Sequence, residues 1–222
     1  NEHRLHAIGQ KGLGAAIGKP GAALFRIPHE SLHRLFVIAA QEVALKAVKE
    51  NVKTENLIKH MLATEAIMRA LAQRFKENED EWGIAGLLHD IDIDLTNADM
   101  KIHGKPGAQM ARELGASDAI CHAILAHNQM LDEPCVSLLD KALFCTDPLT
   151  GLITAAALVR PDKKLAGVET KSIKKRFKEE RFAAGANRAQ IAACSEIGLD
   201  LDDFIALGLE AMKDVAANLG LA

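Results

Sequence analysis

Six residues of types that bind metals or transfer protons fall at predicted helix ends or on apolar helix faces. They are His60, His89, Asp90, His103, His127 and Asp147. The stretch Gly83–Asp94, GIAGLLHDIDID, is the most informative, because an apolar helical run ends there at the adjacent His89–Asp90 pair. Burying an imidazole beside a carboxylate is costly unless a partner satisfies both, and a divalent metal is one such partner. The set contains no cysteine, so it suits iron, manganese, zinc or nickel rather than a Cys-rich structural zinc site.

The elements that must position these residues are predicted to be helices. Aromatic residues make up 4% of the chain, and the abundance of Ala, Leu, Ile and Lys favours helix over strand. Apolar residues recur with helical period, and no strand pattern exceeds a few residues, so we predict an all-α fold. The expected helices cover about 30–49, 54–71, 78–88, 103–114, 117–127, 136–147, 149–159, 188–197 and 201–219. Pro134 suits a first helical turn, and Pro148 predicts that Asp147 lies at a helix end or a kink.

Composition limits the classes of partner and compartment. A net charge of -3 gives no electrostatic reason to expect nucleic acid. The four cysteines form no C-x-x-C pair, which favours a reduced, cytoplasmic setting. No apolar run approaches the ~20 residues of a membrane span, and residues 1–23 do not resemble a signal peptide. We therefore expect a cytoplasmic protein without a membrane partner, and we leave a homo-oligomer open.

The order His, His-Asp, His, His, Asp resembles the HD superfamily of metal-dependent phosphohydrolases. The matching segments are KHMLATEAI around His60, GLLHDID around His89 and Asp90, IHGKPGA around His103, AHN around His127 and CTDPLTG around Asp147. From about Thr54 to Ala222 the chain is similar to an uncharacterised group of HD-type predicted hydrolases. This resemblance implies an HD-domain-like helical bundle over residues 51–160 and a C-terminal helical extension, 161–222, packed on it. Residues 1–50 lie outside it, as an N-terminal extension and helix whose role is open.

The resemblance also implies which residues bind metal. His60, His89, Asp90 and Asp147 would form a first site, and His103 and His127 match the extra histidines of binuclear members. In those members the counterpart of Asp90 bridges two ions. We therefore expect two divalent ions, with iron favoured over manganese, zinc and nickel. The other five histidines, His3, His6, His29, His33 and His122, are not included in the site.

The expected activity is hydrolysis of a phosphate ester or anhydride of a nucleotide or similar small metabolite by a metal-activated water. Asp90 and Asp92 are the predicted catalytic carboxylates, although Asp92 could instead be a loop acid or helix cap. Glu65, Asp92 and Asp94 are candidates for orienting the metal-bound histidines. Lys105 is the predicted contact for a substrate phosphate, against the alternative of a solvated lysine. Two other functions stay open at this point: an HD-type di-iron oxygenase, and a non-catalytic module that senses nucleotides.

Overall fold

The part of the chain that the structure describes folds into helices joined by turns and loops, which confirms the predicted all-α class. The computed structural model describes the backbone of residues 29–222 and the side chains from residue 40 onward, so most of the predicted N-terminal extension lies outside the described residues. The helices are α1 (His29–Asn51), α2 (Glu55–Phe75), α3 (Glu79–Leu88), α4 (Lys105–Glu113), α5 (Asp118–Ala126), α6 (Leu138–Leu158), α7 (Thr170–Phe177), α8 (Arg188–Ala192), α9 (Leu201–Asp214) and α10 (Ala216–Leu219). Short 3-10 turns at Gln129–Leu131, Leu165–Gly167 and Ala193–Ile197 complete the described part.

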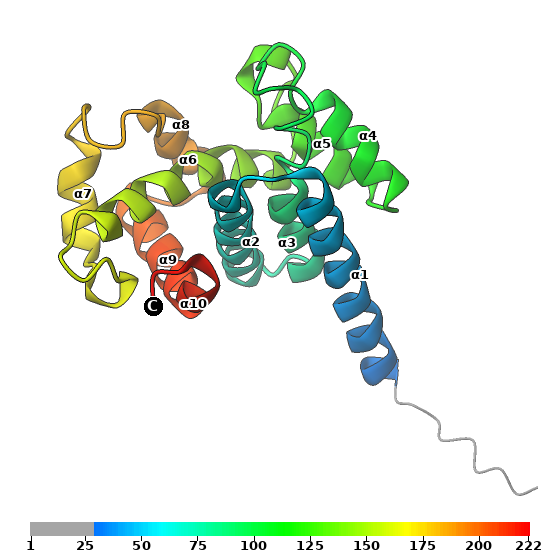
Figure 1. Ribbon diagram of the computed structural model, residues 1–222, viewed down its shortest axis with the longest axis horizontal. Helices are drawn as coiled ribbons and strands as arrows, with labels where there is room; N and C mark the ends of the chain where they lie inside the picture. Colours follow the sequence, from blue (N-terminus) through cyan, green and yellow to red (C-terminus); the bar gives the residue numbers. More distant parts are fainter. Residues whose placement is uncertain (1–28) are drawn as a thin grey trace, which may run out of the picture.

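Helices α2 and α3 lie side by side at the centre of the molecule (Figure 1). Two glycines one turn apart on α3 allow this close approach. A Cβ atom on Gly86 would lie 3.0 Å from the Cα atom of Glu65, and one on Gly83 would lie 2.6 Å from the guanidinium carbon of Arg69. The glycines of the GIAGLLHD segment therefore bring the end of α3 against the middle of α2.

Helix α6 runs from beside α5 to α7 and contacts most of the other helices (Figure 1). It begins with a capping box in which Ser137 and Asp140 satisfy each other's backbone N–H groups. The prediction that Pro134 lies in the first helical turn is wrong, because α6 begins at Leu138. Of the two outcomes predicted for Asp147, a helix end or a kink, the helix end is absent, because α6 continues through Pro148 to Leu158 and joins the two helices expected there. Proline removes one helical donor without ending the helix here, and the residue lies buried in the core.

The C-terminal helices pack on the same core. Helix α9 contacts both α2 and α6, and its Gly208 allows close approach to Leu149, since a Cβ there would lie 2.8 Å from the Leu149 Cδ2 atom. The single helix predicted over 201–219 is interrupted at Val215, whose backbone φ of -107° and ψ of 13° leave the helical range. The short helix α10 follows, and the N–H of Leu165 donates to the carbonyl of Leu221 over 2.9 Å. This bond holds the chain end against the segment that follows α6.

Within the part of the chain that the structure describes, every helix is too short or too polar to cross a membrane.

Candidate metal centre

The six predicted site residues come from five separate segments and meet in one cluster. His60 lies on α2, the His89–Asp90 pair follows α3, and Asp147 lies within α6. His103 precedes α4 and His127 directly follows α5. His89, His103 and His127 are buried, whereas the side chains of His60 and Asp147 remain 21% and 29% exposed. The cluster is therefore closed on one side and reached from the side of His60 and Asp147.

The four imidazoles form two pairs, and each pair faces a different oxygen of Asp90. The Nε2 atoms of His60 and His89 are 3.1 Å apart and lie 3.4 and 3.3 Å from the Asp90 Oδ2 atom. The Nε2 atoms of His103 and His127 are also 3.1 Å apart and lie 3.0 and 3.5 Å from the Asp90 Oδ1 atom. Asp90 is thus the only one of the six that contacts both pairs through separate atoms.

Asp147 joins the pair formed by His60 and His89. Its Oδ1 atom lies 3.2 Å from the His60 Nε2 atom and 3.9 Å from the His89 Nε2 atom. One half of the cluster therefore contains two imidazoles and two carboxylate oxygens, and the other half contains two imidazoles and one.

In every histidine of the cluster, the Nδ1 atom faces a hydrogen-bond acceptor on the outside. The Nδ1 atoms of His89 and His127 lie 2.8 and 2.6 Å from the carbonyl oxygens of the residues three positions earlier, Gly86 and Ile124. A carbonyl can only accept, so Nδ1 carries the ring proton and Nε2 presents its lone pair to the cluster.

The other two histidines are oriented by side chains. The Nδ1 atom of His60 lies 2.7 Å from the hydroxyl of Thr150, which itself donates to the Asp147 carbonyl over 2.8 Å and is thus an acceptor toward His60. The Nδ1 atom of His103 lies 2.8 Å from the Asp92 Oδ1 atom, an ion-pair contact in which the carboxylate favours a proton on Nδ1. All four Nε2 lone pairs consequently converge on the same small volume.

This donor set fits divalent metal. Two lone pairs that face each other over 3.1 Å repel unless a cation or a proton lies between them. Donor atoms bound to one ion at about 2.0–2.2 Å are separated by roughly 3.0–3.5 Å, the same range as the contacts within each half. Imidazole nitrogens with carboxylate oxygens match the ligand preferences of iron, manganese and zinc. The cluster could therefore hold a metal ion.

Electrostatics within the cluster also favour added positive charge. Burial disfavours the charged imidazole of His60, but Asp147 and Asp90 outweigh burial and raise its pKa to about 10. The pKa of His103 rises to about 9 against burial, because Asp90 and Asp92 lie beside it. Burial favours neutral Asp90 as well, yet His89 and the neighbouring histidines hold the pKa of its carboxyl well below the usual range. The ionised carboxylates of Asp90 and Asp147 in this buried cluster therefore require cations around them.

Asp92 lies behind His103 rather than inside the cluster. It is fully buried, and its Oδ2 atom accepts from the backbone N–H groups of Gly104 and Gly107 over 2.8 and 3.0 Å. These donors belong to the first turn of α4, so one carboxylate both caps that helix and holds the His103 ring. The predicted catalytic role of Asp92 stays untested, and its contacts favour a positioning role.

We predict that Asp92→Asn weakens metal binding by about 10- to 100-fold while the fold is retained. An amide has one acceptor oxygen, so it cannot serve both the N–H groups of α4 and the Nδ1–H group of His103. Isothermal titration with Mn²⁺ measures the affinity. Asp99→Asn is the matched control, since the carboxylate of Asp99 accepts only from the nearby exposed backbone N–H of Lys101. Equal affinity in the two variants would contradict a positioning role for Asp92.

Three other predicted residues lie away from the imidazoles. Lys105 is exposed in the first turn of α4 and does not line the cavities that reach the cluster, so its contact with substrate stays a prediction. Asp94 accepts from the backbone N–H of Lys53 over 2.7 Å, and Glu65 pairs with Arg69. Of the candidates for orienting ligands, Asp92 alone contacts a histidine of the cluster.

Two cavities reach the cluster from its exposed side. One, of about 340 Å³, is lined by His60, Asp147 and the loop 183–186, and the other, of about 270 Å³, is lined by Asp90, Asp147, His103 and His127 among others. They share Asp147, so both open onto the same edge of the cluster.

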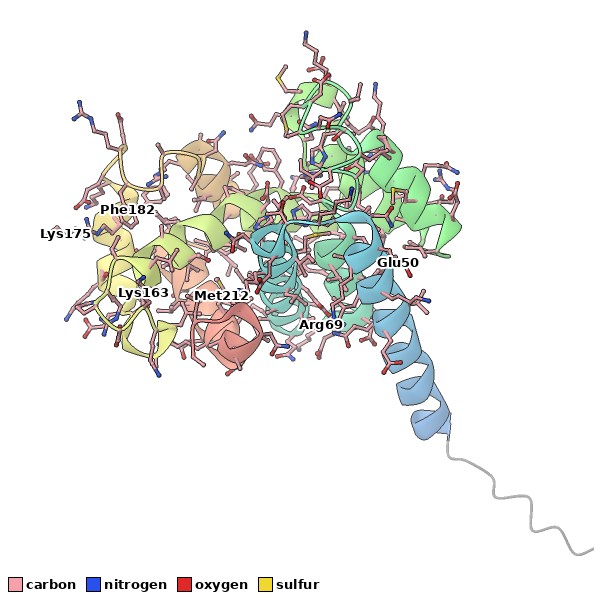
Figure 2. The ribbon with its side chains drawn as sticks, viewed as in Figure 1. Glu50, Arg69, Lys163, Lys175, Phe182 and Met212 are labelled. Atoms are coloured by element: carbon pink, nitrogen blue, oxygen red, sulfur yellow. The ribbon has the colours of Figure 1, made fainter. Side chains whose placement is uncertain are left out.

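A residue without a sequence signal holds the loop that lines the larger of these cavities. The guanidinium of Arg188 donates to the carbonyls of Ala183 and Ala186 over 2.7 and 2.6 Å, and also to that of Phe182. Its partners are backbone atoms, which leave no pattern of residue types, and Arg188 could not be identified before the structure was known. Figure 2 shows Phe182, the residue before this loop, near α7.

Comparison with known proteins places the cluster in a family. Residues 57–160, a range that contains all six cluster residues, match the HD domain family. The ribonuclease Y of Pelobacter propionicus is 34% identical over 98 residues, which cover 44% of this chain and 18% of that protein. The ribonuclease Y of Chloroflexus aurantiacus is 29% identical over 137 residues, covering 60% and 26%, respectively.

A further ribonuclease Y, from Syntrophotalea carbinolica, is 26% identical over 164 residues, which are 74% of this chain and 29% of that protein. The chain therefore spans less than a third of the length of these curated relatives. No solved structure matches it. The match to the HD domain at residues 57–160, a little under half of the chain, agrees with the resemblance seen in the sequence.

Proposed function

We propose that this protein is a metal-dependent phosphohydrolase. The observation that supports the proposal most strongly is the inward orientation of four imidazole lone pairs toward both oxygens of Asp90. Such a site is typical of enzymes that bind divalent ions, and HD domains are known for this chemistry. His60, His89, Asp90, His103, His127 and Asp147 would hold the metal.

We further propose two ions, with Asp90 between them. The separation of the imidazoles into two pairs, each facing its own Asp90 oxygen, supports this number. Iron is the favoured metal, and manganese, zinc and nickel are the alternatives, because all four accept mixed imidazole and carboxylate ligands.

When bound, the ions would lower the pKa of a water molecule and offset the negative charge that develops on a phosphoryl group. The protein residues contribute orientation and charge balance. Thr150 and Asp92 hold His60 and His103 in the tautomer that presents Nε2. Only two carboxylates face two divalent ions, so the loaded site would keep net positive charge and attract an anionic substrate.

The domain organisation supports the same proposal. Residues 51–160 supply all six proposed ligands, and we propose that they form the catalytic core. Residues 161–222 form a helical extension whose α9 contacts α2 and α6. The loop 183–186 of this extension lines a cavity beside His60, so the extension would contribute to substrate binding.

The favoured substrate is a nucleotide or a similar small phosphate ester. RNA is a second candidate, because the named relatives are ribonucleases. The net charge of -3 gives no general attraction for RNA, which favours the small substrate.

Metal analysis combined with a substrate panel tests the proposal. The protein is loaded with Fe²⁺ or Mn²⁺, and phosphate release is measured from mononucleotides and nucleoside polyphosphates, alongside cleavage of a short RNA. His89→Ala is the inactive comparison, because its ring is fully buried in the cluster. His122→Ala is the control, since that histidine pairs with Asp140 and Glu133 instead.

The proposal is supported if the wild-type protein binds metal and releases phosphate, and if His89→Ala abolishes the phosphate release. Cleavage of the RNA alone would favour the second candidate. Oxygen consumption without phosphate release, or nucleotide binding without turnover under either metal, would overturn it in favour of an oxygenase or a sensing module.

A further inference from the structure

A third cavity, of about 400 Å³, lies beside His60 on the side away from His103 and His127. It is bounded by three elements: α2, one face of α6, and the end of α10. His60 and Gly151 line both this cavity and the cavity of about 340 Å³ that the loop 183–186 borders. The two cavities therefore adjoin at the exposed edge of the cluster. A group attached to a phosphate at the cluster can therefore extend into this third cavity.

Much of the cavity lining is apolar. Ala155 and Leu158 contribute from α6, and Leu219 and Leu221 face them from the chain end. The backbone bond from Leu165 to Leu221 fixes that wall in place. Two apolar walls from separate elements suit the faces of a flat heterocycle.

Polar groups are concentrated on the α2 side of the same cavity. Asn56 and Lys59 lie there, one turn apart, with Thr154 on the adjoining face of α6. The ammonium of Lys59 pairs with the exposed Glu55 over 2.7 Å and lies against Gly220, 3.3 Å from where a Cβ atom would be. The cavity therefore offers hydrogen-bond donors from α2 and apolar surface from α6 and the residues after α9. The donors suit the hydroxyl groups of a sugar, and the apolar surface suits the attached base.

Resting on the proposed function, we propose that this cavity binds the nucleoside part of a mononucleotide whose phosphate lies at the cluster. Because three elements bound the cavity, it accommodates one nucleoside, whereas an RNA strand would have to continue past it. Residues 216–222 lie outside the HD match at 57–160, so this wall would give the chain a specificity that the HD domain alone does not supply.

A pair of tryptophan variants tests the assignment. Leu158→Trp fills the cavity from α6, and Leu158 is already 49% exposed, so the fold tolerates the larger side chain. Val159→Trp is the matched control, because Val159 is adjacent, 58% exposed and not part of the cavity lining. Equilibrium dialysis with adenosine measures binding without any metal, and thermal unfolding verifies that both variants are folded. On the metal-loaded protein, KM is measured for adenosine monophosphate and for glycerol phosphate, which has no base.

We expect Leu158→Trp to weaken adenosine binding and to raise KM for adenosine monophosphate by about tenfold or more, with glycerol phosphate unaffected. Val159→Trp should match the wild type both in adenosine binding and in KM for adenosine monophosphate. Loss of adenosine binding in Leu158→Trp would support the cavity even if no substrate is hydrolysed. Equal adenosine binding in the two variants, or none in the wild type, would overturn the assignment and leave the phosphohydrolase proposal standing. A defect of Leu158→Trp toward a short RNA alone would also overturn it.

Discussion

Asp90→Asn is expected to remove at least half of the bound metal and to lower phosphohydrolase activity by about 10²- to 10³-fold or more. The substitution keeps the size of the side chain but replaces one of two oxygens with an amide NH₂, which cannot ligate. Because Oδ1 and Oδ2 face different imidazole pairs at 3.0–3.5 Å, the amide must turn its NH₂ group toward one of them. Metal content by elemental analysis and the rate of phosphate release measure the two effects.

Asp94→Asn is the control for this experiment. Asp94 belongs to the same HDIDID segment, but its carboxylate accepts from the backbone N–H of Lys53 at the start of α2. Its substitution should leave both metal content and rate close to those of the wild type. Full metal content and activity in Asp90→Asn would contradict the bridging role.

The residues of the candidate metal centre could be selected from the sequence, because such residue types are rare in apolar helical runs and stand here in the order of the HD pattern. His60, His89, Asp90, His103, His127 and Asp147 were all selected before the structure was known, and the structure brings them together. The orienting carbonyls of Gly86 and Ile124 were not predicted, although both occupy the same position relative to their histidine. A histidine that directly follows a helix reaches back to the carbonyl three residues earlier.

The parts that were not predictable depend on contacts between distant segments or on backbone atoms. Pro148 indicated a helix end or a kink at Asp147, but α6 continues through it, and burial of the surrounding residues outweighs one missing hydrogen bond. Arg188 gave no signal because its partners are carbonyl groups. The wall formed by Leu219 and Leu221 arises from tertiary packing, which no local pattern encodes.

The ion pair of the buried Glu65 with Arg69 on α2, where this helix packs against α3, should have the largest effect on stability. Glu65 is 4% exposed, and Arg69 donates to it over 3.0 Å and to Asp80 over 2.9 Å. Figure 2 shows Arg69 beside these helices. Arg69→Met leaves the Glu65 carboxylate buried without its cation, so we expect a loss of about 3 kcal/mol in the free energy of unfolding at pH 7, measured with urea. Arg74→Met, at an exposed position of the same helix, should have little effect.

The loss should become smaller as the pH falls. Burial raises the pKa of Glu65, and Arg69 counteracts that rise, so the pKa increases further in Arg69→Met. A carboxyl whose pKa is raised in the folded state destabilises the fold progressively as the pH rises from the ordinary pKa of glutamate to the raised value. Below the ordinary range of glutamate, folded and unfolded chains both hold the proton and the penalty disappears. Urea unfolding at pH 7, 6 and 5 should therefore show variant and wild type converging.

Adding Glu65→Gln to Arg69→Met separates charge from packing. The glutamine side chain has no charge to bury and can still accept from the amide of Gln41, which donates to Glu65 over 2.7 Å. If the uncompensated charge causes the loss, the double variant should recover most of the stability at pH 7 and lose its pH dependence. A double variant as unstable as Arg69→Met would show instead that the guanidinium acts through its packing against Gly83. In that case the close approach of α2 and α3, which places His60 beside His89, would depend on the shape of Arg69 rather than on its charge.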